Sequence, residues 1–334
     1  MVHALPPPPL RPHNLPLRAQ APAGRREEAS FAEAMRRHWR PSPAMRATLW
    51  LHAAGLTGLA LEPAGWPWVA GGLAGNHAVL GLAGMRPRSR LLGPNLSRLP
   101  PAAAARGEVA LTFDDGPDPR VTPRVLDLLE AWGATASFFA IGERAARHPA
   151  LAREILRRGH SLENHTHRHP WSFACWSTTA MRREILAAQR AIAAATGGVE
   201  PRFFRAPAGL RSPLLDPALA GTGLGYASWT RRGYDAVRAD PEAVLRRLTR
   251  DLAAGDILLL HDGNCAGGAA GRPVVLPVLP RLLARIAALG LRAVSLPRAL
   301  LAPAPPPGVA GAGAARAAAA GAAASPAPAA YASP

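Results

Sequence analysis

Residues 107–300 alternate between short apolar runs and longer runs rich in Ala, Leu and Arg, and this alternation predicts an α/β fold. The short runs have the length of strands and are bounded by turn residues, while the long runs have the length of helices. Repeated strand–helix units imply a parallel sheet or a closed barrel. Strands are expected near residues 109–113, 136–141, 161–164, 203–205, 225–229, 257–261 and 291–296.

The composition limits the classes of partner. Of the 334 residues, 39 are basic and 22 acidic, which gives a formal charge of +17. Such a surplus attracts nucleic acid, anionic lipid or acidic glycans. No basic run is interleaved with stacking aromatic residues, so a compositional bias is the preferred explanation and no nucleic-acid partner is expected. Cys175 and Cys265 are too few for a disulfide framework and are expected to be free, buried thiols.

The ends of the chain have low complexity. Residues 1–44 are rich in Pro and Arg and predict a disordered arm, in which nothing resembles a secretory signal peptide. Residues 87–104 are expected to be a linker and residues 301–334 an Ala/Pro-rich disordered tail. The α/β domain is therefore expected at residues 105–300.

Residues 45–86 predict a transmembrane helical hairpin. Between the flanking arginines the only formal charge is Glu62, which lies in a turn sequence that divides the stretch. The second half is long enough to span a bilayer, and the first half is marginal. Trp50, Trp66 and Trp68 lie near the ends of the halves, as interfacial aromatic residues do. A buried hairpin in a soluble protein is the alternative, because the stretch also contains histidine, asparagine and several glycines.

Arginines flank both ends of the hairpin, and the turn between its halves has none. The flanking residues are Arg36, Arg37, Arg40, Arg46, Arg86, Arg88 and Arg90. By the positive-inside rule, both ends then face the cytoplasm. The expected location is a bacterial inner (cytoplasmic) membrane, multi-pass, with the following domain on the cytoplasmic face. A single crossing would place that domain in the periplasm, which is the alternative.

Asp114 and Asp115 directly follow the first predicted strand, in the hexapeptide TFDDGP. Adjacent carboxylates repel each other and lose hydration when buried, so a cation or hydrogen-bond donors must compensate. The carboxyl ends of strands are also where α/β folds keep their chemistry. The pair indicates a metal or an arginine partner, although a turn or a helix cap is the alternative interpretation of this sequence taken alone.

Three histidines follow the third predicted strand. His165, His167 and His169 lie in the sequence ENHTHRHP. In a helix the first and third share a face, in an extended segment all three do, and the proline after His169 is also compatible with a loop. Two imidazoles and one carboxylate form a common catalytic metal site with open positions for water. A surface cluster of histidines is the alternative.

Two further strand ends carry polar residues. Arg205 begins the sequence RAPAG, where its guanidinium is suited to orient a carboxylate and the following N–H groups to face an oxyanion. His261 ends the apolar run ILLLH, and a histidine there is more often structural than catalytic. Four polar motifs at successive strand ends nevertheless indicate one shared site.

Together these motifs resemble the polysaccharide deacetylase family, also called the NodB-homology domain or carbohydrate esterase family 4. TFDD at residues 112–115 is similar to the first family motif, and His165-Thr166 with His169 to the His-Ser/Thr-x-x-His motif. RAPAG at 205–209 resembles Arg-x-Pro-x-Gly, and LLLH at 258–261 resembles Leu-x-x-His. The resemblance covers about residues 105 to 300 and implies a distorted, incomplete (β/α) barrel, here preceded by the predicted membrane hairpin.

The resemblance implies a metal-dependent hydrolase that removes an N-acyl group, acetyl or formyl, from an amino sugar of a polysaccharide or lipid-linked glycan. The implied metal ligands are Asp115, His165 and His169. Zinc is the expected divalent ion, with Co, Ni and Mn as alternatives. Asp114 is the implied general base, Arg205 holds it, and His261 protonates the departing amine. The physical chemistry agrees, because the metal polarises the carbonyl and separate groups perform the two proton transfers.

Two motifs depart from the family pattern. The usual Asp-x-x-Asp-Trp appears within WTRRGYDA at 229–236, where Arg232 replaces the first acid and Ala236 the tryptophan, while Asp235 is expected to orient His261. Ala208 replaces an aromatic residue before the glycine of the third motif, which keeps the N–H donor but loses a sugar-stacking surface. These changes disfavour a long neutral glycan. The adjacent arginines at 231–232 suggest an anionic group, such as a phosphate on a lipid carrier, but solvated surface arginines are the preferred interpretation.

The expected partners are therefore an N-acylated amino-sugar glycan or glycolipid and a membrane. Two other functions are consistent with the sequence. The same site could hydrolyse a non-sugar amide or a cyclic imide. In a different class, the domain could be a catalytically inactive glycan- or lipid-binding module, which metal content would distinguish from an enzyme.

Overall fold

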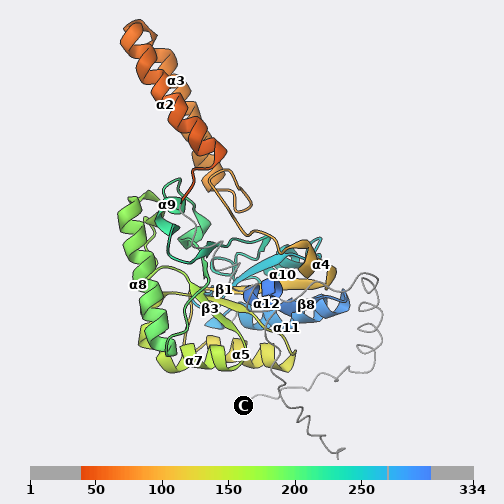
Figure 1. The fold of residues 1–334 in the computed structure, drawn as a ribbon. Helices are drawn as coiled ribbons and strands as arrows, with labels where there is room; N and C mark the ends of the chain where they lie inside the picture. Colours follow the sequence, from red (N-terminus) through yellow and green to blue (C-terminus); the bar gives the residue numbers. More distant parts are fainter. Residues whose placement is uncertain (1–38, 269–270, 302–334) are drawn as a thin grey trace, which may run out of the picture.

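The computed structural model describes residues 39–268 and 271–301. Most of the predicted N-terminal arm and the predicted tail from residue 302 lie outside the described residues. Figure 1 shows a curled α/β domain from which a long helical hairpin projects.

An eight-stranded sheet forms the centre of the domain, and all of its strand pairings are parallel. The strand order is β5-β4-β3-β2-β1-β7-β6, and β8 also pairs with β1. The strands are β1 Glu108–Asp114, β2 Ser137–Ala140, β3 Ser161–Asn164, β4 Phe203–Phe204, β5 Gly225–Tyr226, β6 Arg231–Arg232, β7 Ile257–His261 and β8 Arg292–Val294. Every predicted strand is present, β3 and β7 with the expected bounds, and β6 is an additional strand. The predicted parallel α/β architecture is confirmed.

Helices surround the curled sheet (Figure 1). They are α4 Pro101–Ala105, α5 Thr122–Ala131, α6 Gly142–Arg147, α7 Pro149–Arg157, α8 Thr178–Thr196, α9 Leu215–Leu219, α10 Pro241–Thr249, α11 Val275–Ala288 and α12 Leu296–Leu301. In α8, residues next to the helix determine where it begins and where it ends. Ser177 accepts a hydrogen bond from the N–H of Ala180, and Gly197 ends the helix with a left-handed φ of 78°.

Strand β1 shows how the sheet separates the core from the site. Val109, Leu111 and Phe113 are fully buried in the main core, which includes the apolar faces of α5, α10 and α11. Because successive side chains of a strand point to opposite faces, Asp114 projects into the barrel, where Arg205 contacts it. The register of one strand therefore places an acid inside the barrel.

Residues 87–100, within the segment predicted as a linker, pack on the chain that connects the edge strands β5 and β6. Leu96 forms a parallel bridge with Ala227. The hydroxyl of Thr230 donates to the carbonyl of Ser97 at 2.8 Å. This segment therefore contributes to the wall of the barrel.

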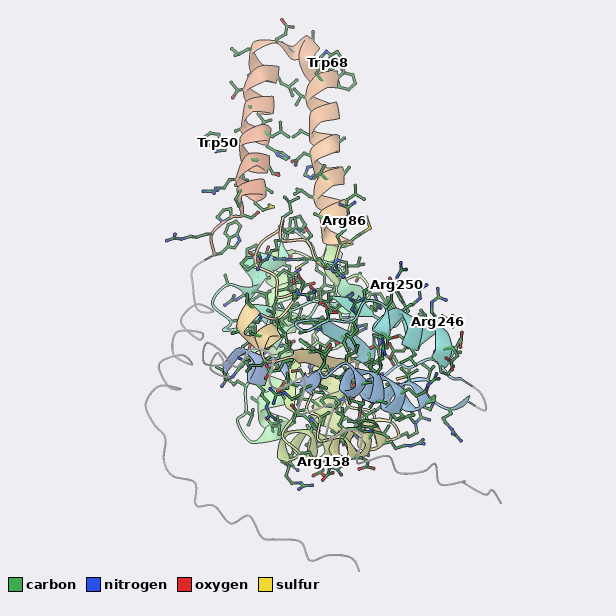
Figure 2. The ribbon with its side chains drawn as sticks, turned by 90° about the vertical axis from the view of Figure 1, so that its right-hand side faces the viewer. Trp50, Trp68, Arg86, Arg158, Arg246 and Arg250 are labelled. Carbon is green, nitrogen blue, oxygen red and sulfur yellow. The ribbon has the colours of Figure 1, made fainter. Side chains whose placement is uncertain are left out.

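The hairpin consists of α2 Pro43–Leu61 and α3 Trp66–Gly84, joined by the short turn η1 Pro63–Gly65. Figures 1 and 2 show that it extends away from the domain. A hydrogen bond joins the two helices: Thr48 Oγ1 in α2 donates to Asn76 Oδ1 in α3 at 3.1 Å. In the part of the chain that the structure describes, no helix combines the length and the hydropathy needed to span a membrane. The predicted hairpin is present, and its insertion into a membrane stays a prediction.

Candidate metal centre and active site

Asp115, His165 and His169 converge just beyond the carboxyl ends of β1 and β3. The Nε2 atoms of His165 and His169 lie 3.3 Å and 3.2 Å from Oδ1 of Asp115. Both strands pair with β2 in parallel, so their carboxyl ends meet at one edge of the sheet. The structure thus brings together the three residues that were predicted as metal ligands.

A loop, rather than a helix or an extended segment, carries the two histidines. The Oδ1 atom of Asn164 accepts a hydrogen bond from the N–H of Thr166 at 3.0 Å. The hydroxyl of Thr166 accepts one from the N–H of His169, also at 3.0 Å. These bonds replace backbone pairing and turn the chain sharply after β3. Consequently His165 and His169 face Asp115, and His167 lies outside the cluster.

The donor set fits one divalent cation. Oδ1 of Asp115 is buried and accepts no hydrogen bond from the described residues. Nδ1 of His165 lies 2.9 Å from the carbonyl oxygen of Arg205, so Nδ1 carries the proton and Nε2 has a lone pair for a cation. Metal–ligand bonds of about 2.1 Å in a tetrahedral site separate the ligand atoms by roughly 3.4 Å. This is close to the 3.3 Å and 3.2 Å between Oδ1 of Asp115 and the Nε2 atoms of the two histidines.

The protonation states of the three groups are coupled. Burial would raise the pKa of Asp115, but contact with His165 and the charges of His261 and His169 lower this pKa below its usual range. Burial opposes the charged form of His165, yet the Asp114 charge and Asp115 raise its pKa. Burial and the His165 charge lower the pKa of His169 to about 4. Cation binding requires a lone pair on Nε2 of both imidazoles, so protons and the cation compete for these atoms.

Arg205 is fully buried and holds Asp114. Its Nη1 atom lies 2.6 Å from Oδ1 of Asp114 and 3.0 Å from the hydroxyl of Thr112. Nε and Nη2 donate to the carbonyl oxygens of residues 227 and 228. The guanidinium also lies 3.9 Å from the centre of the Phe139 ring. The other contacts fix the guanidinium, and the guanidinium in turn holds Oδ1 of Asp114. Oδ2 of Asp114 is left facing the histidine cluster, 3.8 Å from His165 Nε2.

His261 and Asp235 form a second buried pair. Their Nδ1 and Oδ1 atoms are 2.8 Å apart, and the backbone N–H of His261 donates to Oδ2 of Asp235 at 2.7 Å. Burial would lower the pKa of His261, but Asp235, Asp114 and Asp115 raise it to about 9. His261 is therefore protonated at neutral pH, and the partner expected for it is in place.

The two arginines of β6 have different environments. Arg231 pairs with Asp256 and donates to the carbonyl oxygens of residues 250 and 251, so its guanidinium is used within the fold. Neither interpretation of Arg231, an anionic group on the substrate or a solvated surface position, is therefore correct. The guanidinium of Arg232 lies 5.3 Å from the Trp229 ring centre and 4.9 Å from that of Tyr234. Its buried Nε donates to no described residue.

Ala208 lies in the turn η3 Pro207–Gly209 that follows β4. Its φ of 55° is left-handed, and its side chain is exposed. Gly209 is required beside it, because a Cβ there would lie 2.1 Å from the Trp229 ring. The role of the Ala208 N–H toward an oxyanion stays a prediction.

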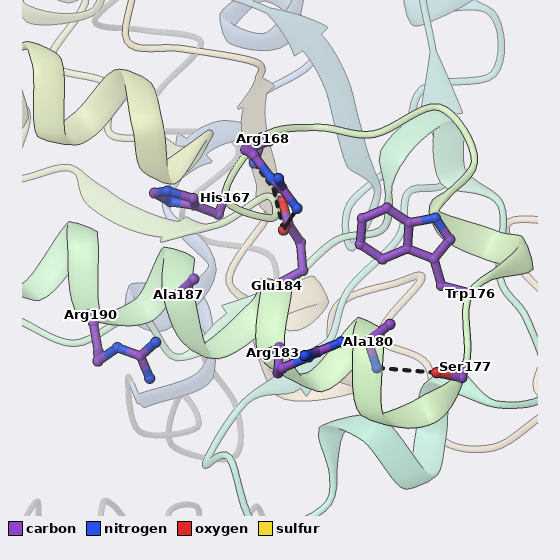
Figure 3. Close-up of a pocket in the computed structure, with 9 residues that line it drawn as sticks. All are labelled: His167, Arg168, Trp176, Ser177, Ala180, Arg183, Glu184, Ala187 and Arg190. Atoms are coloured by element: carbon purple, nitrogen blue, oxygen red, sulfur yellow. Dashed lines mark hydrogen bonds and ion pairs between the residues drawn. The ribbon is translucent and has the colours of Figure 1, made fainter.

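A groove of about 840 Å³ lies behind the histidine loop. Figure 3 shows the residues that line it. The loop residues His167 and Arg168 form one wall, and one face of α8 forms another. The buried carboxylate of Glu184 accepts the backbone N–H of Arg168 at 2.6 Å and pairs with its guanidinium at 3.0 Å. This ion pair anchors the histidine loop to α8.

Sequence reasoning did not single out two residues beside the site. Asp262 is fully buried, accepts a hydrogen bond from Thr122 at 2.6 Å, and has its pKa raised to about 7 by burial. Trp171 is 82% exposed, and its ring centre lies 5.9 Å from that of His169. The sequence could have indicated both residues through their neighbours, because Asp262 directly follows His261 and Trp171 lies two residues after His169.

Comparisons with known proteins agree with this geometry. A family model described as "Polysaccharide deacetylase" matches residues 102–227. The chain is 37% identical over 168 residues to a chitooligosaccharide deacetylase of Sinorhizobium fredii, covering 50% of this chain and 78% of that protein. It is 35% identical over 158 residues to a peptidoglycan-N-acetylglucosamine deacetylase of Bacillus cereus, covering 47% and 73%. The solved structure of a family 4 carbohydrate esterase from Streptomyces lividans, in complex with acetate, matches with a TM-score of 0.50 and 33% identity over 56% of this chain and 91% of that chain.

A curled parallel barrel with a carboxylate–imidazole cluster, a neighbouring acid and a separate His–Asp pair defines a deacetylase-type hydrolase. The chain belongs to the polysaccharide deacetylase family, the NodB-homology domain of carbohydrate esterase family 4. The protein is accordingly a hydrolase of linear amides, acting on carbon–nitrogen bonds other than peptide bonds. The family and the enzyme class predicted from the motifs are confirmed.

Proposed function

We propose that the protein is a metal-dependent deacetylase that removes acetyl groups from N-acetylglucosamine units of an oligosaccharide or of peptidoglycan. One observation carries the proposal, namely that the Asp115–histidine cluster lies beside Asp114, with Oδ2 of Asp114 3.8 Å from His165 Nε2. The substrates named for the relatives, chitooligosaccharide and peptidoglycan N-acetylglucosamine, support this class of substrate.

Zinc is the cation that we propose for the cluster, because imidazole and carboxylate in a three-ligand set with open positions suit it. When bound, such a cation polarises the acetyl carbonyl and lowers the pKa of a water molecule. Cobalt, nickel and manganese remain the alternatives, since the same donors accept them.

The residues of the chain perform the two proton transfers. Asp114 takes a proton from water as the water oxygen attacks the acetyl carbon, because Arg205 fixes Oδ1 and Oδ2 faces the cluster. Asp115 is a ligand and is not available for that role. His261 is protonated and gives its proton to the sugar nitrogen as the C–N bond breaks, which yields acetate and a free amine. The N–H of Ala208 is the proposed donor to the oxyanion.

We infer that the substrate carries an anionic group near Arg232. The guanidinium of Arg232 lies over two aromatic rings, and its buried Nε lacks a partner among the described residues. A small residue, Ala236, replaces the family tryptophan in this motif. A phosphate of a lipid-linked amino sugar suits such a planar, fixed charge.

A bilayer is the partner that we propose for the hairpin. Trp50 is 76% exposed and Trp68 is 86% exposed. The hydrogen bond of Thr48, in contrast, lies between the two helices of the hairpin. Helices that expose apolar side chains on their outer faces need a covering, and a lipid phase provides one. Arg86 lies at the base of the hairpin and away from its tip (Figure 2), as expected for contact with anionic headgroups. The charge flanks favour a catalytic domain on the cytoplasmic face.

The enzymatic proposal is tested by incubating the purified full chain with N-acetylglucosamine oligomers, peptidoglycan fragments and lipid-linked amino sugars, and measuring acetate and formate release. We expect acetate from at least one N-acetylglucosamine substrate, and release that is roughly 10²- to 10⁴-fold slower from Asp114→Asn. Release from none of them, or equal release by that variant, would refute the proposal.

The membrane proposal is tested by flotation with vesicles that contain anionic lipid. The wild type is expected to float, and a Trp50→Ser/Trp68→Ser variant to float less. The matched control is Trp132→Ser/Val199→Ser, which removes exposed apolar residues from the domain instead. Equal flotation of the two double variants would overturn the role of the hairpin. A reporter fused to the C-terminus tests orientation, and activity only in the periplasm would contradict a cytoplasmic domain.

A further inference from the structure

Helix α6 lies between the two segments that carry the metal ligands. The N–H of Gly142 donates to the carbonyl oxygen of Thr166, and that of Glu143 to His167, both at 2.9 Å. These bonds fix the backbone of the histidine loop. A Cβ at position 142 would lie 2.7 Å from the backbone of α8 and 2.8 Å from the His167 ring, so the close approach requires glycine.

Arg144, from the same helix, holds the third ligand. Its Nη1 donates to the backbone carbonyl of Asp115 at 2.8 Å, and its Nη2 donates to Oδ1 of Asn264 at 2.7 Å. An arginine can only donate hydrogen bonds, so the amide atom of Asn264 that faces Arg144 is the oxygen Oδ1. The amide nitrogen Nδ2 therefore faces Asp115. Nδ2 of Asn264 then donates to Oδ2 of Asp115 at 3.2 Å. Arg144 and Asn264 therefore contact Asp115 at its backbone and at its carboxylate.

The backbone around this clamp is built for close approach. At Gly263 a Cβ would lie 2.3 Å from the Asp115 carbonyl oxygen and 2.5 Å from Arg144 Nη1, so a side chain there would break the contact. Asp115 and Asn264 have left-handed φ angles of 72° and 52°. Non-glycine residues hold such angles only where the surroundings fix them.

We propose that Arg144 and Asn264 are positioning residues that make Asp115 a monodentate ligand. The Asn264 hydrogen bond occupies Oδ2, which directs Oδ1, the atom that lies 3.3 Å and 3.2 Å from the two histidines, toward the cation. A single oxygen from Asp115 leaves coordination positions open for water and for the acetyl carbonyl. This inference rests on the proposed function and adds to it the residues that set the geometry of its metal centre.

The test uses the full chain with Arg144→Met and Asn264→Asp, the latter of which keeps the acceptor for Arg144 and removes the donor to Asp115. We expect both variants to bind Zn²⁺ roughly 10- to 100-fold more weakly in competition with a chelator. The absorption spectrum of the Co²⁺-substituted protein should also change, while unfolding of the metal-free protein should stay as in the wild type. Arg147→Met, an exposed arginine of the same helix, is the matched control and should bind like the wild type.

Wild-type Zn²⁺ affinity and an unchanged Co²⁺ spectrum in both variants would overturn the positioning role. So would an equal loss in Arg147→Met, or a loss that parallels destabilisation of the metal-free protein. If the wild type itself bound no divalent cation, the metal-dependent function would fail instead, so the two failures are distinguishable.

Discussion

The carboxylate of Asp235 contacts His261 twice: Oδ1 lies 2.8 Å from the imidazole Nδ1, and Oδ2 accepts the backbone N–H of His261 at 2.7 Å. The two contacts fix the imidazole ring and stabilise its protonated form. A histidine at the end of an apolar strand therefore becomes an acid for the leaving amine.

The first prediction concerns pH. The pKa of His261 is raised to about 9, so protonated His261 is present below that pH and is lost as pH rises through about 9. Asp235→Asn removes the charge that raises this pKa. We expect the alkaline limb of the kcat profile to move to lower pH in this variant. An unchanged alkaline limb would show that His261 is not the titrating acid.

The second prediction separates the two adjacent aspartates. Asp114→Asn should lower kcat by roughly 10²- to 10⁴-fold and leave the Zn²⁺ content unchanged, because it removes the base and keeps the ligands. Asp115→Asn should lower the Zn²⁺ content itself. Metal analysis alongside kinetics checks both, and equal metal loss in the two variants would contradict the assigned roles.

The third prediction concerns stability. Arg205 is fully buried and pairs with Asp114, so Arg205→Met leaves a buried carboxylate without its partner. We expect the free energy of unfolding to fall by about 3–5 kcal/mol, measured by urea denaturation. Arg157→Met, which removes an exposed ion pair, serves as the control and should change it by less than about 1 kcal/mol.

The fourth prediction concerns Trp171, whose exposed ring lies beside the ligand His169. A sugar bound at the cluster would pack on this ring. Trp171→Ala should raise KM by roughly three- to tenfold, about 0.5–1.5 kcal/mol, with kcat nearly unchanged. A fall in kcat at constant KM would instead indicate that Trp171 orients His169.

The convergence of the site was predictable because its residues are each tied to a strand end. Asp115 and His165 follow β1 and β3, and parallel strands on either side of β2 must present their carboxyl ends together. The pairing of Asp114 with Arg205 and of His261 with Asp235 followed from the resemblance to the family motifs. The family motif left His167 out of the ligand set, but the residues alone did not decide between a helix, an extended segment and a loop, because the turn depends on hydrogen bonds of Asn164 and Thr166.

Contacts between distant segments were not predictable where the residues belong to no recognised motif. Arg144 and Asn264 are 120 positions apart, and no periodicity links a helix residue to a loop that follows another strand. Arg231 resembles a free cation in the sequence, but Asp256 lies next to it only in the folded sheet. The strand β6 has two residues, which is too short for a pattern to emerge.

Metal analysis of the purified full chain tests the central claim most directly, with His165→Ala and His167→Ala as a matched pair from one loop. The account predicts about one divalent ion per chain in the wild type and in His167→Ala, because three ligands define one site, and loss of the ion in His165→Ala. A wild type without a bound ion, or equal retention by both variants, would contradict it.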